Sequence, residues 1–108
     1  MLLDAAVGRS LAGADALEEN QIMVASDHLV RAQRIVVELR SVLDFEQGGE
    51  ISINLDRIYE FAHWSLIESF KRRQPQLARN AARALTPIRD GWRESFLTGQ
   101  PAATAVAG

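Results

Sequence analysis

Two short motifs contain residue types that could do chemistry, and one of them is Glu60-x-x-His63. This spacing places a carboxylate and an imidazole on one side of a helix, as in di-iron carboxylate bundles. Such sites need two motifs of this kind plus two further glutamates, all facing inward, and this chain has one motif. On a helix whose core face is centred on Ile58, both side chains point outward. We therefore expect no metal, no cofactor and no catalytic acid–base pair, and we expect His28 to be structural.

The other motif is the glycine pair Gly48-Gly49 before a patterned apolar segment. A phosphate-binding loop needs a Lys-Ser/Thr after its glycines, and a dinucleotide fold needs a third glycine after a strand. Here Glu50 follows, which places an anion where phosphate would bind. A carboxylate at that position suits the positive end of a helix dipole. The pair is interpreted as a hinge between two helices.

Basic residues are concentrated near the C-terminus. Residues 1–70 contain twelve acids and five arginines, whereas residues 71–108 contain seven bases and two acids. Cations such as Lys71 to Arg73 are favoured at the C-terminal end of a helix by its dipole. Because no interleaved aromatics or recognisable nucleic-acid module accompany them, we expect no nucleic-acid partner.

The composition is that of one globular domain. The chain has 108 residues, of which 47% are apolar and 24% charged, and it has no cysteine. Disulfides, zinc ribbons, iron–sulfur clusters and thiol nucleophiles are therefore excluded. No stretch approaches the roughly 20 apolar residues of a membrane span, and Asp4 falls where a signal peptide would need an apolar run. These features predict a cytoplasmic protein without membrane insertion.

The periodicity of apolar residues is helical. Apolar residues recur every three or four positions over residues 3–17, 25–43, 51–66 and 77–92, and no useful length alternates with period two. The sequence therefore predicts an all-α protein with four helices. Short connections would make it an antiparallel up-down-up-down four-helix bundle.

The breaks between these stretches differ in strength. Gly48-Gly49 is a strong helix stop, and Pro75 suits the first turn of a new helix. The first break is weaker, and we place it at residues 18–21, which include Asn20. We predict a single bundle domain over residues 1–97 and a disordered tail over residues 98–108, which are small and turn-rich.

A second apolar stripe lies opposite the core face of two helices. On the second helix Met23, Val30 and Val37 recur every seven residues, and on the third Ile53, Trp64 and Ile67 flank Arg57 and Glu60. Surface helices are normally polar on that side. The stripes indicate grooves for an apolar partner segment, a wide buried face, or a weak homodimer. These three alternatives stay open.

The stretch "LVRAQRIVVELRSVLDFEQGGEISINLDRIYEF" resembles the FliS family of flagellin export chaperones. The similarity includes Leu43-Asp44 leading to the glycine pair, then Asn54-Leu55 and Ile58-Tyr59-x-Phe61. Outside that stretch, Met1-Leu2-Leu3-Asp4 is similar to the family's Met-Leu-Tyr-Asp, and Ile88-Arg89-x-x-Trp92 to its Leu-Arg-x-x-Trp. Family-motif residues expected to be structural are Asp4, Gly48, Gly49, Asn54, Leu55, Arg89 and Trp92.

The resemblance implies a cytoplasmic bundle that binds the unfolded C-terminal segment of flagellin. Binding would keep flagellin from polymerising before it reaches the type III export apparatus, and an export-gate protein or a co-chaperone is a further candidate partner. Our candidate residues for the client are Met23, Val30, Val37, Ile53, Arg57, Tyr59, Trp64 and Ile67. The alternative function is a self-associating helical bundle without a flagellin client.

One departure concerns the N-terminus. The family normally has a further segment before the Met-Leu-Tyr-Asp region, and here Leu3 replaces the tyrosine. Either the start was assigned too late or the chain is a shortened homologue, and both readings predict helices left partly uncovered.

Overall fold

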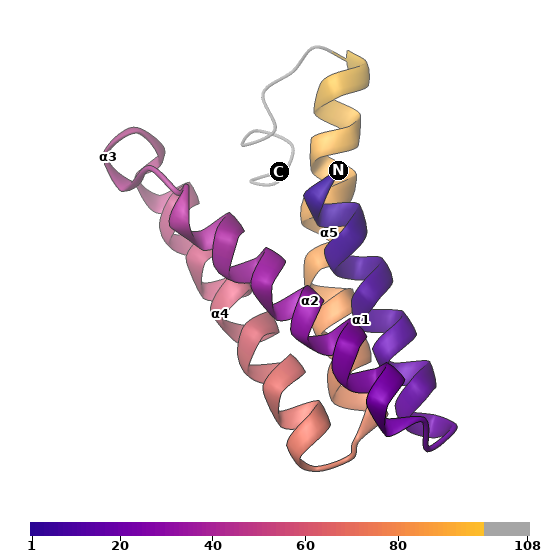
Figure 1. The fold of residues 1–108 in the computed structure, drawn as a ribbon. Coiled ribbons are helices and arrows are strands. Elements are labelled where there is room, and N and C mark those ends of the chain that lie inside the picture. Colours follow the sequence, from indigo (N-terminus) through magenta and orange to yellow (C-terminus); the bar gives the residue numbers. More distant parts are fainter. Residues whose placement is uncertain (99–108) are drawn as a thin grey trace.

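The computed structural model describes residues 1–98, with side chains described as far as residue 93, and every element in that part is a helix. The predicted all-α class is therefore confirmed. The elements are α1 (Leu2–Glu18), α2 (Ile22–Ser41), α3 (Phe45–Gly48), α4 (Glu50–Lys71) and α5 (Pro75–Thr98) (Figure 1). Residue 98 of the predicted tail ends α5, and the rest of that tail lies outside the described residues. No helix in the described part is long and apolar enough to cross a membrane.

Two of the three connections between the long helices fall where the sequence predicted them. After α1, Asn20 adopts a φ of 57°, and the Gln21 N–H donates to the Ala16 carbonyl at 2.9 Å. Asparagine tolerates this left-handed conformation better than most residues, which explains the reversal at a position without glycine. Pro75 begins α5. Proline lacks a backbone N–H, and at the first position of a helix this group would have no helical hydrogen bond to make.

The connection around the glycine pair differs from the prediction, because α2 ends at Ser41 and a one-turn helix, α3, precedes the hinge. Asp44 explains the extra turn, since its carboxylate accepts hydrogen bonds from the N–H groups of Glu46 and Gln47 at 3.1 and 3.0 Å. Such a cap starts a helix by pairing donors that would otherwise lack partners. Gly49 then separates α3 from α4 with a φ of 53° and a ψ of −125°.

Replacing Gly49 by alanine is expected to destabilise the protein by about 1–3 kcal/mol, because side chains with a Cβ rarely adopt this backbone conformation. A Cβ at Gly49 would meet no atom within 4 Å, so the effect would come from the backbone alone. The control is Gly8→Ala, also free of neighbours but inside α1, which should be neutral or stabilising by up to about 1 kcal/mol. Urea denaturation would measure the stability of both variants. Equal effects of the two substitutions would contradict the backbone conformation described for Gly49.

The four long helices pack as a ring in which each contacts the next along the chain. α1 packs against α2 and α5, and α4 packs against the same two helices. Figure 1 shows the α1–α5 pair and the α2–α4 pair diverging toward the end that carries α3 and the N-terminus. The helices are therefore close together at one end and spread apart at the other.

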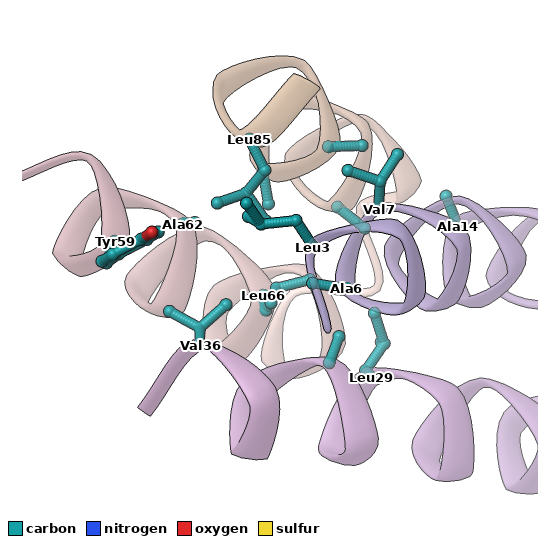
Figure 2. Close-up of a cluster of buried hydrophobic side chains, with 14 of the residues drawn as sticks. Leu3, Ala6, Val7, Ala14, Leu29, Val36, Tyr59, Ala62, Leu66 and Leu85 are labelled. Carbon is teal, nitrogen blue, oxygen red and sulfur yellow. The ribbon is translucent and has the colours of Figure 1, made fainter. Parts of the chain in front are cut away.

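The core is built mostly from small side chains. Nine alanines and four serines are among its buried residues, and the largest fully buried apolar side chains are Leu29, Leu66, Leu85, Ile88 and Val36. Figure 2 shows several of these side chains meeting between the four long helices. Within the described part, the Ser65 hydroxyl is a buried side-chain group with no hydrogen-bond partner, whereas Ser10 and Ser69 each donate to a carbonyl in their own helix at 2.7 Å.

Candidate partner-binding surfaces

The outer face of α4 carries exposed apolar side chains at positions of the second stripe. Ile53 and Trp64 are both exposed, Trp64 at 49% of its surface. Trp64 lines a shallow hollow of about 360 Å³ together with Arg57, Glu60 and Phe61. Phe61 is exposed at 46% and was not among the predicted binding residues, although its spacing from Trp64 on the helix was visible in the sequence.

The outer face of α2 is also apolar in part. Met23, Val30 and Val37 are exposed, and the first two line a second hollow of about 310 Å³. Asp27 and Arg31 share this hollow and form an ion pair at 3.0 Å. The alternative of a wide buried face is therefore wrong for these three side chains.

The two outer faces do not form one groove. Each hollow is lined by residues of a single helix, α2 in one case and α4 in the other. Two predicted binding residues also lie differently from the rest. Ile67 is half-buried, and Tyr59 is only 3% exposed and belongs to the core. Tyr59 lies on the face of α4 that meets the other helices, so it is not part of the outer stripe (Figure 2).

A deeper cleft, which the sequence did not reveal, opens where the two helix pairs diverge. It measures about 450 Å³ and is the most apolar of the hollows described here. Its walls are residues 1–3 at the start of α1, Leu55 and Tyr59 of α4, Trp92 of α5, and, where α2 ends, Leu39, Val42 and Leu43. We name it the end cleft.

Two of the family-motif residues, Leu55 and Trp92, line the end cleft. Asp4 and Arg89 lie beside it and connect α1 to α5, because the Asp4 carboxylate contacts the guanidinium groups of Arg89, at 3.9 Å, and Arg93. Asn54 is exposed on α4. Between α2 and α4, Arg40 donates to the Asp56 carboxylate at 2.8 Å, and this hydrogen bond raises the pKa of the Arg40 guanidinium.

At the other end of the bundle, Arg79 of α5 contacts Glu18 at 2.8 Å and Asp15 at 3.4 Å, both on α1. The hydrogen bond from Arg79 and its positive charge lower the pKa of the Glu18 carboxyl. A carboxyl with a lowered folded-state pKa contributes stability above its unfolded pKa and loses it as the pH falls through its folded pKa. The contact therefore weakens on acidification.

The variant Arg79→Gln is expected to raise the pKa of Glu18 toward its ordinary value, because it removes both the charge and the ionic hydrogen bond. An NMR titration of the side-chain carboxyl carbon would measure this. Arg31→Gln is the matched control: it should raise the pKa of Asp27, whose largest cause of lowering is the Arg31 hydrogen bond, and leave Glu18 unchanged. A Glu18 pKa that does not move in Arg79→Gln would contradict the assignment.

The titratable groups of the described residues are not gathered into a metal site. Among the described residues no group of three or more histidine, aspartate or glutamate side chains is placed to hold a metal ion. Glu60 is exposed in the α4 hollow, and His63 is half-buried. His28 accepts a hydrogen bond at Nδ1 from Arg9 at 3.1 Å, which links α1 to α2 in a structural role.

Comparison with known proteins identifies the family. The family model described as "Flagellar protein FliS" matches residues 1–98. Flagellar secretion chaperone FliS of Vibrio cholerae is 30% identical over 92 residues, which cover 85% of this chain and 68% of the relative. Flagellar secretion chaperone FliSB of Pseudomonas aeruginosa is also 30% identical, over 85% of this chain and 73% of the relative. Flagellar secretion chaperone FliS of Salmonella typhimurium is 27% identical, over 87% of this chain and 70% of the relative. The chain therefore belongs to the FliS family, whose members are flagellar secretion chaperones and not enzymes.

Proposed function

We propose that this chain binds the C-terminal segment of flagellin in the cytoplasm, prevents its premature polymerisation and aids its delivery to the type III export apparatus. In this proposal the four long helices form an antiparallel up-down-up-down bundle, and the client contacts the outer faces of α2 and α4. The observation that carries the proposal is the exposure of Val30, Val37, Ile53 and Trp64 on two well-packed helices. The relatives' names support the chaperone role.

Two separate hollows favour an unfolded client over a folded one. The hollows lie on different helices, and each is shallow and only partly apolar. A segment of about 40 residues can extend to roughly 130 Å, which is several times the 42 Å length of the molecule. Such a segment can reach both hollows by wrapping around the bundle, whereas a compact partner would need one continuous surface. An export-gate protein or co-chaperone would then bind the loaded complex.

The test is isothermal titration of the chain with a peptide of about 40 residues from the C-terminus of its own organism's flagellin. We expect binding with one peptide per chain, and a scrambled peptide of the same composition should not bind. The absence of heat at tens of micromolar would contradict the proposal. Sedimentation of the chain with and without the peptide distinguishes the alternative function. A strong dimer that persists when the peptide is added would indicate self-association without a client.

A further inference from the structure

The two hollows on the outer faces differ in charge. Four of the six residues that line the α2 hollow are polar or charged, and they are Ser26, Asp27, Arg31 and Arg34. Two guanidinium groups therefore share that hollow with one carboxylate. The α4 hollow balances one guanidinium group against one carboxylate and adds two aromatic rings. The α2 hollow thus has an excess of positive charge, whereas the α4 hollow is neutral and more apolar.

The single carboxylate of the α2 hollow, Asp27, already has two cationic partners. Arg31 donates to one of its oxygens at 3.0 Å, and Arg9 of α1 lies 3.8 Å from the other oxygen. The hydrogen bond from Arg31 lowers the pKa of the Asp27 carboxyl, and the charges of Arg31 and Arg9 add to the lowering. Asp27 is therefore ionised at neutral pH and engaged with Arg31 and Arg9.

Arg34 is the guanidinium group of the α2 hollow that is left over. It is exposed, and it forms no ion pair with another described residue. Glu38 follows one turn later on α2, but it does not line the hollow and forms no ion pair either. A basic residue that precedes an acidic one by four positions is the weaker of the two possible orders on a helix.

An apolar side chain lies beside this arginine. Val30 precedes Arg34 by four residues, which places the two side chains next to each other on the helix surface, and both line the hollow. Val30 is exposed. The hollow therefore offers a guanidinium group without an ionic partner and an uncovered apolar surface at adjacent positions.

We propose that the α2 hollow binds an acidic side chain of the flagellin segment through Arg34, with a neighbouring apolar side chain of that segment covering Val30. This inference rests on the proposed function and names the chemistry at one of its two surfaces. A guanidinium group matches a carboxylate through two parallel N–H···O hydrogen bonds, and the positive charges of Arg31 and Arg34 oppose a cationic side chain there. The neutral α4 hollow then takes the larger apolar side chains of the segment.

The experiment compares two peptides on two variants by isothermal titration. One peptide is the C-terminal flagellin segment, and the other is the same segment with every aspartate and glutamate changed to asparagine and glutamine. At low salt Arg34→Gln should weaken the unaltered peptide by about two- to fivefold, the range of exposed ion pairs, and leave the amide peptide unchanged. The loss should shrink toward 1 M salt, where charges are screened over about 3 Å.

Arg83→Gln is the matched control, because Arg83 of α5 is also exposed, forms no ion pair with another described residue and lines neither hollow. It removes the same net charge and should leave both affinities unchanged. Equal effects of the two variants, or an equal loss for both peptides in Arg34→Gln, would overturn this inference and leave the proposed function standing. A flagellin segment without aspartate or glutamate would also overturn it. An unaltered peptide that does not bind the unsubstituted chain would overturn both.

Chemical cross-linking tests where the acidic side chain lies. Lys71 is the single lysine of the chain, so the double variant Arg34→Lys, Lys71→Arg carries its one lysine in the α2 hollow. A carbodiimide joins a peptide carboxylate to that amine as an amide, with loss of water, and mass spectrometry identifies the linked residues. We expect this product in good yield. The matched variant Arg83→Lys, Lys71→Arg should give little of it, and equal yields would overturn the assignment to the α2 hollow.

Discussion

The variant Leu66→Ala is expected to lower the free energy of unfolding by about 2–5 kcal/mol, because it removes a large buried side chain and leaves a cavity. Leu66 is 0% exposed and lies on α4 where the four long helices meet (Figure 2). Most of the buried residues of the core are alanines and serines, so the few large side chains supply much of the apolar area that folding removes from water. Domains of this size are typically stable by only about 5–15 kcal/mol.

The matched control is Leu11→Ala, which deletes the same atoms from a leucine that is 44% exposed on α1. It should cost well under about 1 kcal/mol, because less apolar surface returns to water and no cavity forms. Urea denaturation would measure both variants, with the midpoint shifting and the denaturant slope unchanged if unfolding stays two-state. Similar losses in the two variants would contradict the burial of Leu66 in the core.

The helices and most of their ends were predictable from local chemistry. Asn20 and Pro75 act within their own turns, so a single sequence reveals them. The extra helix α3 was missed because it depends on Asp44, whose capping role requires the chain to leave α2 two residues before Leu43-Asp44. That departure was not visible in the apolar spacing, which continues to Leu43.

The orientation of α4 was predicted only approximately. The apolar stripe was centred on Ile58, which is half-buried, whereas Tyr59, Ser65 and Ser69 are buried. Serine carries little weight in a hydrophobic pattern, but its small size lets neighbouring helices approach closely. The buried face of α4 therefore includes its serines and is rotated away from Ile58, which places Tyr59 in the core. Burial raises the pKa of the Tyr59 hydroxyl accordingly.

The outer stripes and the end cleft differ in how far sequence could reveal them. Val30, Val37 and Ile53 are apolar at positions opposite a helix's core face, and that is a property of one helix. The end cleft arises because two pairs of helices diverge, which is set by the packing of all four. Leu39 and Leu43 continue the core stripe of α2 in the sequence, yet they are only half-buried because no helix covers them there.

The variant Trp64→Ala is expected to weaken binding of the flagellin segment by about 30-fold, which corresponds to about 2 kcal/mol. Trp64 has the largest side chain on the outer faces of α2 and α4, and half of its surface remains to be covered by a partner. Arg57 and Glu60 flank it in the α4 hollow, and they can keep water away from the indole once a partner covers it. The effect should appear mainly in the dissociation rate, because the loss is of contacts made after docking.

Trp92→Ala is the matched control, since the two tryptophans are the same residue type with nearly equal exposure, 49% and 45%, on different surfaces. If the client binds the outer faces, Trp92→Ala should change its affinity by less than about threefold, while Trp64→Ala produces the full loss. Isothermal titration of the same flagellin peptide into both variants would measure this. A larger loss in Trp92→Ala would place the client in the end cleft, because only a partner covering that cleft would bury the Trp92 ring.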